Sequence, residues 1–447
     1  MNVMAEVKVI KTAAETALAH SFAQARPHLP GGTEIAKERA AAFDVFVREG
    51  LPHRRVEEWK YTDLRALMRD AKPLASPPDA QAKARAKSAG ALIGDVEARR
   101  LVFVDGAFVP ELSDTAALEQ GLTVGSLAAA LIGNDADLTA HLGKLAPASD
   151  VAVALNTALM GDGAVIRVGA GATIERPLHL VFTASDKPAA SFVRSLMIVE
   201  QGARVMLVES HEGPAGSDYQ VNAALELFVA DKAHVDHVKI IGEGAEALHV
   251  STLAAAIGAK ARFNSFTFTI GGAVVRNQLF LKFDGEGTVA NIRGATLLKG
   301  RQHADTTLVA NHIARGCQSR EVFKSVLDDE AHGVFQGRIV VRQGAQQTDA
   351  KMMTRALLLS ERAEADNKPE LEIFADDVQC GHGATAGALD DELKFYLMAR
   401  GIPAAEAEAL LIQAFLGEAV EGIEHAGLRE ALMDQVAAWV KARAKKD

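Results

Sequence analysis

The chain has 447 residues, of which 49% are hydrophobic, and a formal net charge of −10. This length exceeds what a single core usually supports, and this composition excludes global disorder. The acidic balance argues against nucleic acid or an anionic membrane as the main partner. Two cysteines in a chain this long do not make a disulfide framework, so we expect a reducing, cytoplasmic location.

Residues 1–95 are predicted to form a helical domain. In "ERAAAFDVFVREGLP", Phe43 and Phe46 share one helical face, and Gly50 ends the helix. The first 22 residues mix charged residues among the apolar ones, so no export signal is expected. No run approaches the roughly 20 apolar residues that span a membrane.

Residues 96–387 are predicted to be mainly β, and an internal repeat runs through them. In each copy, an apolar residue is followed four positions later by Ala or Gly, and six positions later usually by another apolar or small residue. Successive small residues are 31, 30, 28, 26, 44 and 32 positions apart, so we expect an irregular turn or an insertion in the longest gap. The copies are Val168–Ala172–Ile174, Val199–Ala203–Val205, Val229–Ala233–Val235, Ile257–Ala261–Phe263, and the looser Phe283–Gly287–Val289, Leu327–Ala331–Gly333 and Leu359–Ala363–Ala365.

This repeat predicts a β-solenoid. A unit that cannot bury its apolar face alone must stack on its neighbours, and the small residue suits a tight corner between two faces. Short β-type runs fill the segment from about residue 151 to residue 380, and no ten-residue helical pattern separates them. The alternative is a β-sandwich whose turns are similar by coincidence.

Residues 388–447 are predicted to form a second helical domain. Asp390 is a candidate N-cap in "LDDELKFYLMARGIP", and Gly401 is a C-terminal stop. The segment "AAEAEALLIQAFLGEAVEGI" carries two neighbouring apolar stripes. One stripe comprises Leu411, Phe415 and Ala419, and the other comprises Ile412, Leu416, Val420 and Ile423.

The sequence contains no motif for nucleotide binding or for hydrolytic catalysis. There is no G-x-x-x-x-G-K-[ST] loop, no G-x-S-x-G elbow and no H-E-x-x-H or C-x-x-C pair. Several histidines and Cys317 could be metal ligands, but such residues are more often structural. The histidines considered are His234, His237, His303, His312 and His332.

The stretch "DDVQCGHGATAG" is the strongest candidate site. Cys380 and His382 project to one side of an extended chain, and both side chains are good ligands for iron or zinc. Two ligands do not complete a zinc or iron–sulfur site. The pair is therefore half a site that another chain, or a cluster's own sulfide and water, must complete. The alternative is a glycine-rich turn with an incidental Cys and His.

Four segments resemble the SufB/SufD family of scaffold proteins for iron–sulfur cluster assembly by the SUF system. They are "EEWKYTDL" (57–64), "GRQHADTTLVANHIARGCQSREVFKSVL" (300–327), "KPELEIFADDVQCGHGATAGALDDELKFYLMARGI" (368–402) and "LIQAFLGEAVEGI" (411–423). SufB-type chains carry a C-x-x-C-x-x-x-C-type motif that is absent here, which favours the SufD branch. A SufB-like paralogue is the alternative.

The resemblance implies a right-handed parallel β-helix between two helical domains, and a scaffold that is not itself an ATPase. Such chains pair with SufB through the β-helix, and their C-terminal helices receive the ATPase SufC. A transient iron–sulfur cluster, not held by this chain alone, would form at the interface with SufB. The position that matches the family's important histidine is His382; Cys380 is the weaker candidate, and Gly381 stands where family members commonly have Ser.

The resemblance also gives expectations for the rest of the complex. The apolar stripes are where SufC would dock, or else they pack on the end of the solenoid. Reduced flavin in the complex and a homodimer of the isolated chain are left open. A polysaccharide lyase or hydrolase on a β-helix would need an export signal and stacked aromatics, but aromatic residues make up only 5% of the chain. A self-assembling solenoid without ligand is the other alternative. The docking candidates are Leu411, Phe415, Leu416, Val420 and Ile423.

Overall fold

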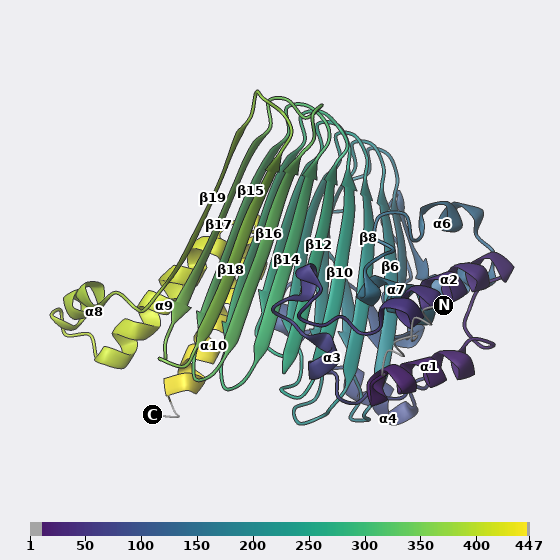
Figure 1. Cartoon of the computed structure of the whole chain (residues 1–447), viewed down its shortest axis with the longest axis horizontal. Helices are drawn as coiled ribbons and strands as arrows, with labels where there is room; N and C mark the ends of the chain where they lie inside the picture. Colours follow the sequence, from purple (N-terminus) through teal and green to yellow (C-terminus); the bar gives the residue numbers. More distant parts are fainter. Residues whose placement is uncertain (1–10, 445–447) are drawn as a thin grey trace, which may run out of the picture.

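Long parallel strands dominate the computed structural model, which describes residues 11–444 (Figure 1). The first ten residues, which belong to the segment where no export signal is expected, lie outside this range. The strands are β1 (Arg99–Val104), β2 (Ala107–Phe108), β3 (Leu122–Ser126), β4 (Ala164–Val168), β5 (Leu178–Thr183), β6 (Ala190–Val199), β7 (Arg204–Glu212), β8 (Gln220–Val229), β9 (His234–Gly242), β10 (Leu248–Ile257), β11 (Arg262–Thr269), β12 (Val274–Phe283), β13 (Val289–Leu298), β14 (His303–His312), β15 (Gln318–Leu327), β16 (His332–Val341), β17 (Asp349–Leu358), β18 (Glu364–Ile373) and β19 (Gln379–Gly387).

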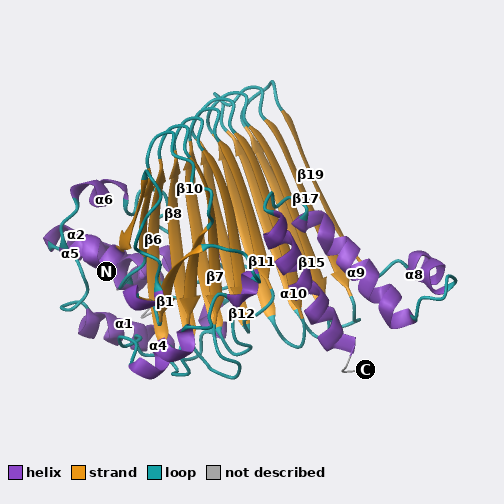
Figure 2. Ribbon diagram, turned by 180° about the vertical axis from the view of Figure 1, so that it is seen from behind, coloured by secondary structure: helices purple, strands orange, loops and turns teal. Residues whose placement is uncertain are grey.

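From β4 onward, successive strands alternate between two sheets that face each other across a shared interior (Figures 1 and 2). The ten-stranded sheet has the order β19-β17-β15-β13-β11-β9-β7-β5-β1-β2, and the nine-stranded sheet has the order β18-β16-β14-β12-β10-β8-β6-β4-β3. Among the described residues, β4 to β19 make eight two-stranded turns of a parallel β-solenoid. This confirms the predicted fold class, mainly β with helices at both ends.

The repeat marks one edge of the solenoid, where each even-numbered strand passes into the next odd-numbered one. Val199, Val229, Ile257 and Phe283 end β6, β8, β10 and β12 and stack in register. All four are buried in the core, and burying each such side chain contributes roughly 1.5–3 kcal/mol. The small residues that follow lie in the corners; Ala203, for example, is also buried.

The gap of 44 residues contains no insertion, so that expectation was wrong. At the same edge, His312 of β14 occupies the position of Phe283 in the preceding turn, and the two rings stack 4.1 Å apart. Because this position holds a histidine, this copy of the repeat does not match a pattern that requires an apolar residue there. The last two copies, around Ala331 and Ala363, lie at the opposite edge, where odd-numbered strands pass into even-numbered ones.

The N-terminal helices cover the outer face of the nine-stranded sheet, where Leu248 and Val250 of β10 share a cluster with them. As predicted, a helix ends at Gly50, whose φ is 71°. The prediction of β-type runs from residue 151 was wrong for nine residues, because Asp150 caps a helix there by accepting from Val153 N. The helices are α1 (Ala13–Ala25), α2 (Thr33–Glu49), α3 (Leu64–Leu67), α4 (Ala80–Ala86), α5 (Leu127–Ile132), α6 (Ala136–His141) and α7 (Val151–Leu159), with short 3-10 turns at Glu57–Trp59, Ala91–Ile93 and Pro110–Leu112.

The C-terminal helices lie on the opposite side of the solenoid. Helices α9 (Ala404–Val420) and α10 (Ala426–Ala444) cover the outer face of the ten-stranded sheet, where α9 contacts β13 and β15 (Figure 2). Helix α8 (Asp391–Met398) projects away from the sheets (Figure 1). None of the helices in residues 11–444 is long and apolar enough to cross a membrane. The domain divisions after residues 95 and 387 stay a prediction.

Candidate functional site

Cys380 and His382 lie on β19, the outermost strand of the ten-stranded sheet. Cys380 is in register with Ala350 of β17, and His382 is in register with Met352. Ala350 and Met352 are buried in the interior of the solenoid. Because residues two apart on a strand share a face, Cys380 and His382 both extend this interior column at its C-terminal end.

The last turn of the solenoid is open. Strands β18 and β19 have 10 and 9 residues, and all of these residues are partly or fully exposed. In the preceding turn, most residues of β16 are buried. No strand among residues 11–444 pairs with the outer edges of β18 and β19. Long unpaired edges are places where another chain can add to a sheet.

The two candidate ligands differ in exposure. Cys380 is half-buried and packs against the interior core, whereas His382 is exposed. A side chain at Gly381 would meet open space, so the Gly in place of the family's usual Ser has no steric consequence. A Cβ at Gly383 would lie 2.7 Å from Cε of Met353, so glycine keeps this part of the strand close to its neighbour.

Burial raises the pKa of the Cys380 thiol, and the negative charges of Asp349 and Glu321 raise it further. The thiol therefore stays largely protonated near neutral pH until a metal ion or a cationic partner displaces its proton.

Glu321 is a buried carboxyl group that sequence reasoning missed. It lies on β15, and β15, β17 and β19 place Glu321, Met352 and His382 in one column. It is 0% exposed, and neither carboxylate oxygen accepts a hydrogen bond of ordinary geometry. Burial raises the pKa of Glu321 to about 7, against partial opposition from the Ser319 hydroxyl. A group that titrates near neutral pH thus lies in the interior beneath the candidate site.

Three of the other weighed histidines have separate surroundings. His237 contacts Glu209 and Ser265, His312 is buried, and His234 lies 3.4 Å from Asp236. A further pair meets on the outer face of the nine-stranded sheet, where Nδ1 of His303 and Nδ1 of His332 are 3.2 Å apart. Cys317 is fully buried with its Sγ near main-chain carbonyls, as expected of a structural cysteine.

The predicted docking stripes lie mostly against the solenoid. Leu416, Val420 and Ile423 are buried in a cluster with the ten-stranded sheet and α10, and Phe415 packs against it. Leu411 is partly exposed. Packing on the solenoid, the alternative interpretation, is therefore what these three buried residues do in the chain, and their part in partner binding stays a prediction.

An exposed apolar surface lies instead on α8. Four of its eight residues are large apolar side chains that are exposed, and Phe395 is 72% exposed. Leu410 of α9 is also exposed. We call the α8 residues the α8 patch: Leu393, Phe395, Tyr396 and Met398.

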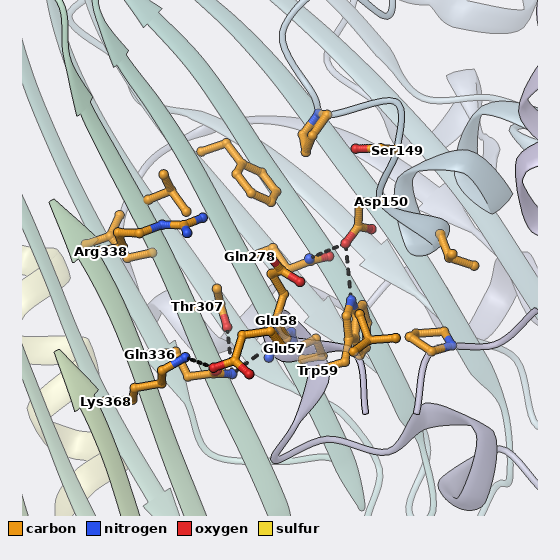
Figure 3. A pocket seen from close by; sticks show the side chains of 18 of the residues that line it. Glu57, Glu58, Trp59, Ser149, Asp150, Gln278, Thr307, Gln336, Arg338 and Lys368 are labelled. Carbon is orange, nitrogen blue, oxygen red and sulfur yellow. Dashed lines mark hydrogen bonds and ion pairs between the residues drawn. The ribbon is translucent and has the colours of Figure 1, made fainter. Parts of the chain in front are cut away.

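A pocket of about 450 Å³ opens on the outer face of the nine-stranded sheet, beside the segment that contains Trp59 (Figure 3). Asp150 accepts hydrogen bonds from Trp59 at 3.3 Å and from Gln278 at 3.0 Å. Arg338 and Lys368 line another part of it. Because its walls carry both signs of charge, the pocket does not indicate one class of ligand. It also lies outside the interior column that leads to His382.

Comparison with known proteins identifies the family of the chain. Residues 181–415 match the family described as "SUF system FeS cluster assembly, SufBD core domain", and residues 14–180 match the "SufBD protein N-terminal region". The chain belongs to the SufBD family of iron–sulfur cluster assembly proteins.

Two relatives align over nearly the whole chain. It is 33% identical to an iron–sulfur cluster assembly SufBD family protein of Synechocystis, over 90% of this chain and 91% of the relative. It is 30% identical to the iron–sulfur cluster assembly protein SufD of Escherichia coli, over 91% of this chain and 93% of the relative. The chain is therefore a SufD homologue.

Proposed function

We propose that this chain is the SufD-type scaffold subunit of a SUF complex, and that it helps to assemble nascent iron–sulfur clusters for transfer to apoproteins. The observation that carries the proposal is the open last turn, where His382 and Cys380 continue the interior column at a sheet edge that no strand of residues 11–444 pairs with. The cluster is the cargo of this site and needs ligands from a second chain.

The partner at this end would be SufB. The outer edges of β18 and β19, which no strand of residues 11–444 covers, can pair with strands of another solenoid and so extend both sheets across the interface. Such pairing would place the partner's thiolates opposite His382. Moving the two chains apart would open the coordination shell and release the cluster.

The ATPase SufC would bind at the C-terminal helices. The chain has no phosphate-binding loop of its own, so we assign ATP hydrolysis to this partner. The α8 patch presents exposed apolar side chains, which are typical of a protein interface. Helix α9 connects α8 to the solenoid through its contacts with β13 and β15, so movement of SufC could be transmitted to the sheets.

Anaerobic co-expression with SufB and SufC tests the proposal. We expect the three chains to co-purify, and iron and acid-labile sulfide to be found with the complex rather than with this chain alone. Spectra of the same complex test for reduced flavin, and sedimentation of the isolated chain tests for a homodimer. A chain that recruits neither protein would instead favour a self-assembling solenoid.

A further inference from the structure

Three metal-ligating side chains meet inside the solenoid, far along the chain from β19. His211 is on β7, Glu243 follows β9, and His249 is on β10. Each offers one ligand atom, and these three atoms lie within 4.8 Å of one another. The exposed fractions of the three residues are 1%, 6% and 0%. None of them was a candidate from sequence, where they are separated by 32 and 6 positions.

The cluster faces the apolar interior. His211 is in register with Phe182 of β5, and the two rings stack 4.7 Å apart. His249 is in register with Val275 of β12, which is buried in an interior cluster. Polar groups in such surroundings destabilise the fold unless they have partners.

Yet three of the four ring nitrogens of His211 and His249 lack a hydrogen-bond partner within the described chain. Neither ring nitrogen of His211 has a hydrogen bond within the described chain, and Nε2 of His249 has none either. A neutral imidazole has a lone pair that a metal ion can accept. The unsatisfied nitrogens would then gain a partner.

The space and the supporting contacts fit an ion. A cavity of about 20 Å³, enough for one water molecule or one small ion, is lined by His211 and Glu243 but not by His249. The Tyr219 hydroxyl donates to Glu243 Oε2, and Nδ1 of His249 lies 2.9 Å from Glu243 Oε1. The hydrogen bond from Tyr219 is of the kind that orients the carboxylate ligands of metal sites.

We propose that His211, Glu243 and His249 form a buried site for one divalent transition-metal ion. Two imidazoles and one carboxylate suit Zn²⁺ or Fe²⁺ rather than Ca²⁺ or Mg²⁺. Bonds of about 2.0–2.2 Å place ligand atoms roughly 3–3.5 Å apart, so the side chains need to close by about 1 Å. The positive charge of the nearby Lys239 ammonium would repel the ion, but it is balanced by the Glu209 carboxylate, which lies 3.7 Å from it.

Metal titration of the full chain tests the site. The starting protein carries Cys380→Ala and His382→Ala, so that the candidate ligands on β19 contribute nothing. After chelator treatment, we expect it to bind one Co²⁺ per chain with the visible bands of nitrogen and oxygen ligation, and Zn²⁺ to displace the Co²⁺. Anaerobic titration with Fe²⁺ determines which of the two physiological ions binds more tightly. A protein that binds none of the three ions at micromolar concentrations overturns the proposal.

Single substitutions in the same protein locate the ion. His211→Asn and His249→Gln are expected to weaken Co²⁺ binding by more than about tenfold, and Tyr219→Phe by roughly tenfold through the orientation of Glu243. His312→Gln, which changes another buried, inward-facing histidine, should bind as the starting protein does. Equal affinity in all of these variants would mean that the ion binds elsewhere and that the proposal is wrong. If a ligand variant does not fold, a rise of the melting temperature of the starting protein with Zn²⁺ is still required.

Discussion

The ammonium group of Lys324 donates a hydrogen bond to the main-chain carbonyl of Phe415, 2.8 Å away, and so joins the ten-stranded sheet to α9. Lys324 lies on β15 and is 3% exposed. Its charge is balanced by Glu418 and lies 4.6 Å from the centre of the Phe415 ring. This buried cation fixes the helix that leads to the α8 patch onto the solenoid.

Replacing Lys324 should therefore loosen the C-terminal helices. We expect Lys324→Met to lower the free energy of unfolding by about 1–2 kcal/mol, because the hydrogen bonds of a buried charge are lost. Proteolysis should begin earlier at α9 and α10. Lys351→Met, at an exposed lysine of β17, is the matched control and should change neither quantity. Equal protease resistance of the two variants would show that Lys324 does not hold α9.

Glu321 should make stability depend on pH. Its pKa is about 7 in the folded chain and near 4.5 when exposed, so between these values the folded state binds the additional proton. Stability should therefore fall as pH rises from about 4.5 to about 7, by about 3 kcal/mol in total. Glu321→Gln should remove this slope in urea unfolding, whereas Glu330→Gln, at an exposed site, should keep it. Parallel pH profiles of wild type and Glu321→Gln would contradict the assignment.

The two cysteines should differ in reactivity. Cys317 is fully buried, whereas Cys380 is partly accessible with a pKa raised by burial and by nearby carboxylates. Alkylation followed by mass spectrometry should label Cys380 alone in the folded chain, and more slowly than a free cysteine at pH 8. Removing the charge with Glu321→Gln should speed labelling roughly threefold. Labelling of Cys317 at a similar rate would contradict its burial in the solenoid.

The α8 patch should be needed for binding the ATPase but not for folding. Phe395→Asp places a charge in the proposed interface and should abolish co-purification of SufC, with no loss in melting temperature, because Phe395 is 72% exposed. Ile132→Asp changes a side chain that is 70% exposed on α5 and should leave the complex intact. Retention of SufC by Phe395→Asp would show that the interface with SufC lies outside the α8 patch.

The stacking of the solenoid could be predicted from sequence because it depends on a local pattern. Val199, Ala203 and Val205 form an apolar–small–apolar corner that any turn of this kind requires. The pattern failed where a residue that is not apolar fills the same stacking position, as His312 does against Phe283. It also failed at α7, whose largely apolar run, interrupted by Asn156 and Thr157, is equally suited to a strand or a buried helix.

The sites could be predicted only in part. Cys380 and His382 are neighbours in sequence, so their common face followed from alternation along a strand. The residues that change the surroundings of this pair come from other turns of the solenoid. Glu321, for example, lies 59 positions before Cys380, and only the pairing of β15 and β19 with β17 brings the two strands into one sheet. The cluster of His211 and His249 escaped notice for the same reason.

The central claim is that His382 is this chain's ligand for a cluster completed by a second subunit. Iron and acid-labile sulfide on the anaerobically purified complex with SufB and SufC test it most directly. We predict that His382→Ala leaves the three chains associated and reduces both contents to a small fraction of wild type. His28→Ala, at an exposed histidine of the N-terminal region, should keep them unchanged. Wild-type iron and sulfide in the His382→Ala complex would contradict the account.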